Sequence, residues 1–221
     1  MALGIAAYAV ALVATIPASV VFRNTTMRSG VAGTVWNGEV GIAGGSALRW
    51  NWAPLRSLLG LGFAADWKAA GPDTDLGGQA LAGFSTTRFD HVSGSAPARL
   101  LEAIQPTLPF TCDLNGQVEM EKVVLRGSGK MMQGRMVSDP GSCQPKSGGV
   151  ATAVPSLLLT AEKTGNSTRI RVAPSAQRLK TLIDVTMAED GAMTITVTPE
   201  GASMLPFLGA PPAGAKVQAA L

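Results

Sequence analysis

The chain begins with a long apolar run and continues with short segments that alternate apolar and polar residues. Residues 2–22 contain no charged side chain, and Arg23 supplies the first charge. A helix over this run would be about 31 Å long at about 1.5 Å per residue, which matches the hydrocarbon thickness of a bilayer. The pattern therefore predicts a single transmembrane helix over residues 2–22, so that residues 1–22 form a membrane anchor.

Two other interpretations of this run stay open. A cleaved signal peptide normally shows basic residues before a shorter apolar core, and no basic residue precedes this core. A buried helix of a globular domain is normally amphipathic, whereas this run is apolar on every side. An uncleaved anchor fits the run best.

After the anchor, the periodicity is mostly that of β-strands. Leu48, Trp50 and Trp52 alternate with polar residues, which is the period of two of an extended strand with one buried face. Comparable segments recur along the body, at 31–40, 62–68, 77–84, 85–92, 116–126, 134–138, 156–163, 167–173, 180–189 and 192–199. Such a series of short strands predicts an antiparallel sheet.

Turn and helix signals complete the predicted fold. The dipeptides Gly165-Asn166 and Asp190-Gly191 predict two hairpins. One helix is expected over 95–105, and residues 209–221 are expected to be a flexible tail. The fold class is therefore mainly β: an N-terminal transmembrane helix, then a curved, mostly antiparallel β-sheet domain over 23–208 with one short helix. The curvature is expected from the 26 glycines, many of which interrupt strands.

Composition and charge exclude several classes of function. Hydrophobic residues make up 46% of the chain, charged residues 15% and aromatic residues 5%. The net charge of +3 is dispersed, and no basic stripe carries aromatic residues, so nucleic-acid binding is not expected. The single histidine excludes a multi-histidine metal site. We expect neither a metal nor another cofactor.

Catalytic motifs are also missing. A Ser-His-Asp triad would need His91, but the chain has no G-x-S-x-G segment to supply the serine. The adjacent Asp90 would project to the opposite strand face. The stretch 123–132 resembles a phosphate-binding loop, yet Val124 and Met131 stand where that motif needs glycine and serine or threonine. The chain is therefore expected not to be an enzyme, with His91 as a surface or turn residue.

The cysteines bear on the compartment of the body. Cys112 and Cys143 are the only two in the chain, and they flank a turn-rich stretch. An even pair outside any metal-binding pattern predicts a disulfide in an oxidising compartment, and the alternative is two unrelated buried thiols. Arg23 and Arg28 alone would place the body in the cytoplasm by the positive-inside rule. We give the cysteines more weight and expect the body outside the cytoplasm.

One segment near the anchor is rich in glycine and tryptophan. The glycines permit bends or close strand approach, and the tryptophans bury large areas. The simplest interpretation is that these are core and turn residues; the alternatives are a partner-binding face or a belt at the membrane interface. The residues of the segment are Gly30, Gly33, Trp36, Gly38, Trp50, Trp52 and Pro54.

This segment resembles the type II secretion system protein N family, whose members carry an apolar anchor, a G-x-x-G-x-x-W-x-G segment and a W-x-W/L-x-P strand end. The resemblance extends more loosely through the whole chain. It implies a non-enzymatic, single-pass protein of the bacterial inner membrane with a periplasmic β domain. Its implied partners are other secretion-apparatus subunits, together with the lipid bilayer through residues 2–22.

An alternative function follows from a second, weaker likeness. Similar glycine- and tryptophan-rich segments occur in the AsmA-like lipid-handling family of envelope proteins. The apolar, charge-poor strands would then form a groove on the curved sheet that binds a lipid or another hydrophobic ligand.

Overall fold

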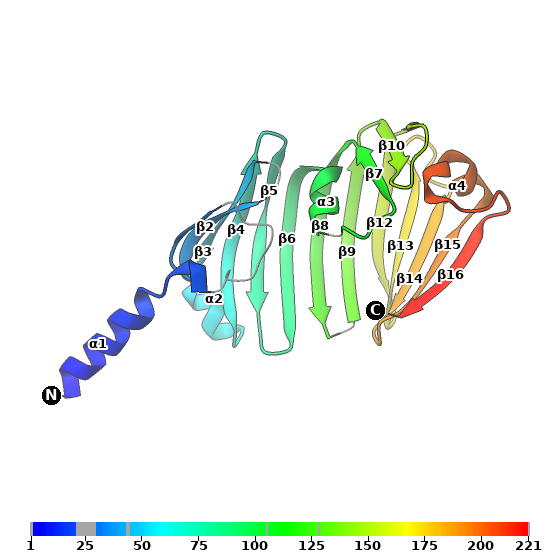
Figure 1. Ribbon diagram of the computed structural model, residues 1–221. Coiled ribbons are helices and arrows are strands. Elements are labelled where there is room, and N and C mark those ends of the chain that lie inside the picture. Colours follow the sequence, from blue (N-terminus) through cyan, green and yellow to red (C-terminus); the bar gives the residue numbers. More distant parts are fainter. Residues whose placement is uncertain (1, 21–29, 43–44, 105, 128, 221) are drawn as a thin grey trace.

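Consecutive strands of the body pair with their neighbours to form one large sheet (Figure 1). The computed structural model describes residues 2–20, 30–42, 45–104, 106–127 and 129–220. The sheet has thirteen strands in the order β1-β2-β3-β4-β5-β6-β8-β9-β12-β13-β14-β15-β16. Every pairing between these neighbours is antiparallel, so the expectation of a mainly β, antiparallel fold is confirmed.

The strands of the large sheet are β1 (Val31–Gly33), β2 (Asn37–Ile42), β3 (Ser46–Trp52), β4 (Phe63–Gly71), β5 (Thr74–Ala82), β6 (Thr86–Pro97), β8 (Asn115–Arg126), β9 (Gly129–Ser138), β12 (Leu157–Thr164), β13 (Ser167–Pro174), β14 (Ile183–Ala188), β15 (Ala192–Val197) and β16 (Ala215–Ala220). A second sheet has three strands, in the order β11 (Thr152–Val154), β10 (Gly141–Pro145) and β7 (Phe110–Asp113). The helices are α1 (Ala2–Ala14), α2 (Pro54–Leu59), α3 (Ala98–Ile104) and α4 (Pro199–Met204), with short 3-10 turns η1 (Ala18–Val20) and η2 (Pro206–Leu208).

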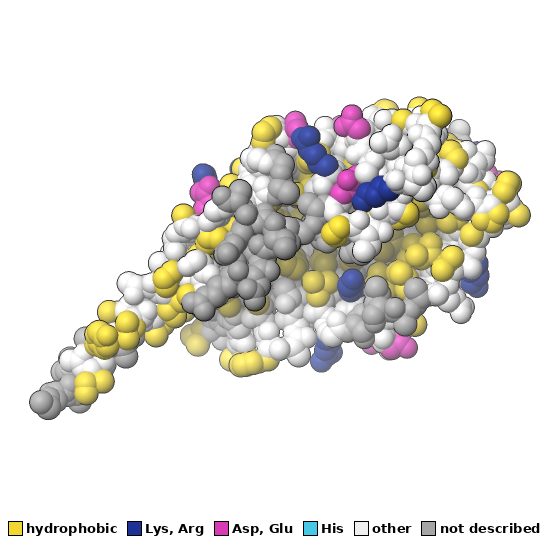
Figure 2. Space-filling view, in the orientation of Figure 1, with side chains coloured by type: hydrophobic (Ala, Val, Ile, Leu, Met, Phe, Trp, Pro, Cys, Tyr) yellow, Lys and Arg dark blue, Asp and Glu magenta, His cyan; other side chains and the backbone are white. Residues whose placement is uncertain are grey.

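The large sheet has one apolar face and one charged face. Because successive side chains of a strand point to opposite faces, the register places residues of one kind in rows across the sheet. One apolar row runs through Trp52, Ala65, Ala80, Phe89, Val123 and Met132. A second runs through Met136, Leu159, Val172, Ile183, Val197 and Ala215. Figure 2 shows apolar side chains gathered in the hollow of the curved sheet.

Ion pairs cover the opposite face. Arg49 and Glu39 are 2.7 Å apart on β3 and β2, and Lys68 and Asp75 are 3.0 Å apart on β4 and β5. The hydrogen bond from Arg49 to Glu39, with their attraction, raises the pKa of the Arg49 guanidinium above its ordinary value. These groups are exposed, so they keep this face wetted and add little stability.

The three-stranded sheet covers part of the apolar face. Its residues Cys143 and Val154 are buried with Leu182, Leu205 and Phe207 against Leu157 and Ile183 of the large sheet. Cys112 on β7 lies opposite Cys143 on β10, and the two form the expected disulfide. The bond therefore holds the small sheet together where it packs on the large one.

The N-terminal helix differs from the prediction. Helix α1 ends at Ala14, so the predicted helix over residues 2–22 is wrong in its length. The chain leaves the helix because Pro17 forms a bridge with Thr34 and Val35 donates to the carbonyl of Ile16. In the part of the chain that the structure describes, no helix is long and apolar enough to cross a membrane. Residues 21 and 22 of the predicted span lie outside the described residues.

The C-terminal segment is also more ordered than predicted. A flexible tail is expected over 209–221, yet Ala215–Ala220 form strand β16 and pair with β15 along six residues. The exposed backbone of β15 provides hydrogen-bonding partners that the local sequence does not reveal. The predicted helix over 95–105 is present in a shorter form as α3, and the two predicted hairpins join β12 to β13 and β14 to β15.

We predict that the disulfide supports the fold strongly. Its cysteines are 31 residues apart, and the chain-entropy model assigns such a loop about 3–4 kcal/mol. The double variant Cys112→Ser/Cys143→Ser should lose that much free energy of unfolding in urea denaturation of the full chain. The wild type in reductant is the control and should match the variant; unchanged stability in both would contradict the prediction.

Candidate functional site

Three indole N–H groups lie where the N-terminal segment meets the sheet, and each has a different partner. Trp36 donates to the carbonyl of Val13 in α1 at 2.8 Å. Trp50 donates to the carbonyl of Val35 at 2.9 Å, and Trp52 donates to the hydroxyl of Ser57 in α2 at 2.8 Å. These hydrogen bonds join α1, the loop before β2, and α2 to one another and to β3. We call this group the tryptophan junction.

The rings of the junction also contact one another. The Trp36 ring centroid lies 4.7 Å from that of Trp52 and 6.1 Å from that of Phe63. Trp50 is buried and lies opposite Gly38 in the sheet register. A Cβ at Gly38 would come within 2.5 Å of the Trp50 ring, so only glycine leaves room for it. The Trp50 ring therefore packs over β2 at this glycine.

The remaining motif residues build the local backbone. Gly33 has φ 84°, which suits the turn from β1 into the loop before β2. The carbonyl of Gly30 accepts from the amide of Gly41 and so extends the pairing of β1 with β2. Pro54 begins α2, where its missing amide costs no hydrogen bond. The structure thus brings the motif residues into one region, whereas Cys112 and Cys143 lie together elsewhere.

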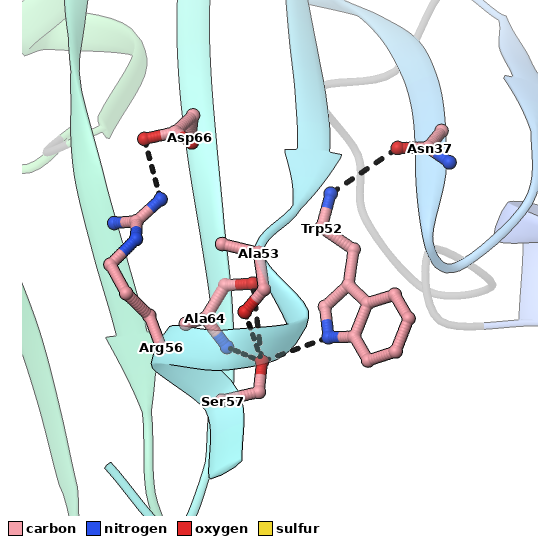
Figure 3. Close-up of polar contacts among 7 residues, drawn as sticks. All are labelled: Asn37, Trp52, Ala53, Arg56, Ser57, Ala64 and Asp66. Atoms are coloured by element: carbon pink, nitrogen blue, oxygen red, sulfur yellow. Dashed lines mark hydrogen bonds and ion pairs between the residues drawn. The ribbon is translucent and has the colours of Figure 1, made fainter. Parts of the chain in front are cut away.

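The hydroxyl of Ser57 forms several hydrogen bonds, and no sequence motif predicts this role (Figure 3). Its hydroxyl accepts from the indole of Trp52 and from the amide of Ala64 at 2.9 Å, and it donates to the carbonyl of Ala53 at 2.9 Å. Arg56, the residue before it, forms an ion pair with Asp66 on β4 at 2.6 Å. Helix α2 is therefore attached to the sheet through its polar side chains.

An apolar pocket of about 590 Å³ lies beside the tryptophan junction, on the apolar face of the sheet. Every residue that lines it is apolar: Ala18, Val35, Leu48, Trp50, Phe63, Ala65, Trp67, Ala80 and Phe89. Trp67 and Phe89 meet edge to face, with ring centroids 6.4 Å apart. The indole N–H of Trp67 is buried and has no hydrogen-bond partner. The alternation of Phe63, Ala65 and Trp67 is visible in the sequence, but only the register across four strands reveals the pocket.

His91 lies among charged and polar side chains of β6, β8 and β9. His91 is an exposed residue of β6 with φ 52°, beside the irregular register between β5 and β6. Its surroundings include Glu119, which pairs with Arg135, and Glu121, which accepts from Gln133. Among the described residues, no group of three or more histidine, cysteine or acidic side chains could hold a metal ion.

The fold and the junction define an open, two-faced β-sheet protein with an apolar helix at its N-terminus. A family model described as type II secretion system (T2SS), protein N matches residues 26–218, which extends from before β1 into β16. The chain therefore belongs to the type II secretion system protein N family, and the resemblance seen in the glycine- and tryptophan-rich segment is confirmed. No curated protein and no solved structure matches the chain.

We predict that Gly38→Ala destabilises the junction. The added Cβ would lie 2.5 Å from the Trp50 ring and 2.9 Å from the carbonyl oxygen of Ala32, and overpacking of this kind costs about 1–3 kcal/mol. Gly77→Ala in β5 is the matched control, because its Cβ would meet nothing closer than 3.4 Å. Chemical denaturation followed by tryptophan fluorescence should show the loss only for the Gly38 variant, and equal losses would count against the proposed role of Gly38.

Proposed function

We propose that the protein is a non-enzymatic component of a type II secretion apparatus that contributes to assembly through subunit contacts. The observation that carries this proposal is the family match over residues 26–218, which include nearly the whole sheet. The apolar segment that contains α1 would anchor the protein in the bacterial inner membrane, and the β domain, which extends through β16, would lie in the periplasm.

The disulfide supports the periplasmic location. Structural disulfides persist in oxidising compartments such as the periplasm and are rare in the cytosol. Cys112 and Cys143 are joined in the structure, and Cys143 is buried. Free thiols at these two positions, trapped by alkylation in intact cells, would contradict this compartment.

The free edge of the sheet offers a means of contact with other subunits. Strand β16 pairs with β15 on one side only, and no described strand covers its other side. Natural edge strands are usually protected from pairing by prolines or several charged side chains. Strand β16 contains no proline and one charged residue, Lys216. At the opposite edge, β1 has only three residues. Strand addition at β16 would supply backbone hydrogen bonds to a partner.

We predict that a photo-crosslinking amino acid at Gln218 in β16 captures other secretion-apparatus subunits in membranes. Thr186 in β14 is the matched control, because it is also exposed and lies in the same cross-strand row, two strands away from the edge. Mass spectrometry of the crosslinked species should identify apparatus subunits at Gln218 and few or none at Thr186. Crosslinks only to unrelated proteins, or equal yields at both positions, would contradict this contact.

A second candidate function is binding of a lipid or another hydrophobic ligand. The wholly apolar pocket of about 590 Å³ supports it. The strands that form its floor are paired on both sides, so they have no free backbone groups for a peptide. A hydrocarbon chain needs no such groups and gains about 25 cal/mol for each Å² of apolar surface removed from water.

We predict that Ala80→Phe, which adds a ring inside this pocket, lowers the affinity for a fluorescent long-chain fatty acid by about tenfold or more, the equivalent of two buried methylene groups. Ala70→Phe is the matched control, since Ala70 is exposed on β4 and does not line the pocket. Titration of the full chain measures both affinities. Binding that the two variants share with the wild type, or no binding at all, would exclude the pocket as a ligand site.

A further inference from the structure

Large apolar side chains are exposed at the end of the sheet where α2 lies. Leu55, Leu58 and Leu59 of α2 are 74–85% exposed, Leu61 is 78% exposed, and Phe84 in the turn between β5 and β6 is fully exposed. We call these five residues the leucine patch. Single exposed apolar residues are ordinary, but a group of this size at one end of a protein marks an interaction surface.

Helix α2 has its polar and apolar residues in the reverse of the usual arrangement. A surface helix normally turns its apolar side chains toward the protein and its polar ones toward water. Here Arg56 and Ser57 face the sheet, through the ion pair with Asp66 and the hydrogen bonds of the Ser57 hydroxyl (Figure 3). The leucines point away, and no residue of α2 is buried. The outer side of α2 is therefore built for apolar surroundings.

The packing of the backbone brings the two parts of the patch together. A Cβ at Gly62 would lie 2.6 Å from the carbonyl oxygen of Ala82 and 3.1 Å from the Cα of Gly83. This close approach places Leu61 beside the turn that carries Phe84. The leucine patch is consequently one surface that spans α2 and the turn between β5 and β6.

Two features indicate what covers the patch. The first is continuity with α1, because Trp36 bonds to Val13 of α1 and its ring contacts Trp52, which bonds to α2. Figure 1 shows α1 and α2 at the same end of the molecule. Helix α1 and the leucine patch can therefore contact the same apolar surroundings at once.

The second feature is basic charge beside the patch. Arg126 lies opposite Thr86 in the register, next to the turn that carries Phe84. Lys130 lies opposite Leu125 on the following strand, and both basic side chains are exposed. Apolar residues flanked by basic ones are the pattern of proteins that bind anionic membrane surfaces.

We propose that the leucine patch is a second membrane contact, which rests on an anionic phospholipid bilayer while Arg126 and Lys130 meet the headgroups. The inference rests on the proposed anchoring through α1 and extends it: the end of the sheet that carries α2 lies on the bilayer surface. The partner is a lipid surface of negative charge. A second copy of the chain or another subunit over the patch is an outcome that the test below distinguishes.

The test uses an environment-sensitive fluorophore on single cysteines of the full chain, at Leu58→Cys or Phe84→Cys. Both native cysteines are joined in a disulfide, so only the introduced thiol reacts. Leu179→Cys is the matched control, because Leu179 is a fully exposed leucine in the loop between β13 and β14, at the opposite end of the strands. The proteins are reconstituted into vesicles of phosphatidylethanolamine and phosphatidylglycerol, with and without a nitroxide-labelled lipid.

We expect the probes at positions 58 and 84 to shift to the blue and to be quenched by the nitroxide lipid, and the probe at position 179 to do neither. In the Leu58→Cys protein, Arg126→Gln/Lys130→Gln should lower the equilibrium constant between probe in contact with lipid and probe in water, by about fivefold for each basic side chain removed. Vesicles of neutral phosphatidylcholine should give the same reduction without any substitution.

Vesicle flotation separates failure of this inference from failure of the anchor. Protein that floats with the vesicles but shows the same unquenched signal at positions 58, 84 and 179 overturns the patch and leaves the anchor standing. A blue shift at position 58 without quenching by lipid means that protein covers the patch, which also overturns the proposal. Protein that does not float overturns the proposed anchoring and the patch with it.

Discussion

The tryptophan junction is the interaction on which the rest of the structure depends. Trp50 and Trp52 belong to β3 and Trp36 lies in the loop before β2, and their indole N–H groups bond to three separate pieces of the chain. Trp50 is buried, and leaving its indole donor without a partner would cost its full desolvation penalty, so its bond to Val35 is strongly favoured. Trp52 is exposed, so its bond serves mainly to fix the position of α2. Through Val13 and Ser57 the junction sets the positions of α1 and α2 relative to the sheet. The end of the sheet that lies next to α1 is thereby determined.

The second constraint is the apolar face of the open sheet, which extends across the width of the sheet. The small sheet and its disulfide cover that face near β12 to β14, where Leu182 and Leu205 are completely or almost completely buried. Near the tryptophan junction the same face forms the apolar pocket instead. The two ends of one sheet thus differ in what covers them. The difference links the fold to the proposed functions, since the covered end belongs to the core and the pocket is the site proposed for a hydrophobic ligand.

Most strands could be predicted from the sequence, because alternation with a period of two is a local signal. The hairpins at Gly165 and Asp190 carried equally local turn signals. The length of α1 could not be predicted, since the chain leaves the helix through the bridge between Pro17 and Thr34, which is a contact between distant residues. Strand β16 depends likewise on the free edge of β15.

The candidate sites show the same division. The glycine- and tryptophan-rich motif marked the junction, but it did not reveal Ser57, whose role comes from the meeting of α2 with β4. The pocket requires the register of β3 to β6, and the outward direction of the leucines requires the attachment of Arg56 to Asp66. The sequence shows which residues of the pocket and of the leucine patch are apolar. Tertiary packing decides whether each of them faces the pocket, the core or solvent.

The central claim is that the junction directs the α2 end of the sheet onto the bilayer. Neutron reflectometry of the full chain in a supported bilayer of phosphatidylethanolamine and phosphatidylglycerol tests it directly. The account predicts protein density that begins within the headgroup layer and extends outward by up to about 40 Å, the length of a twelve-residue strand such as β6. A water layer between the headgroups and the sheet would contradict the claim.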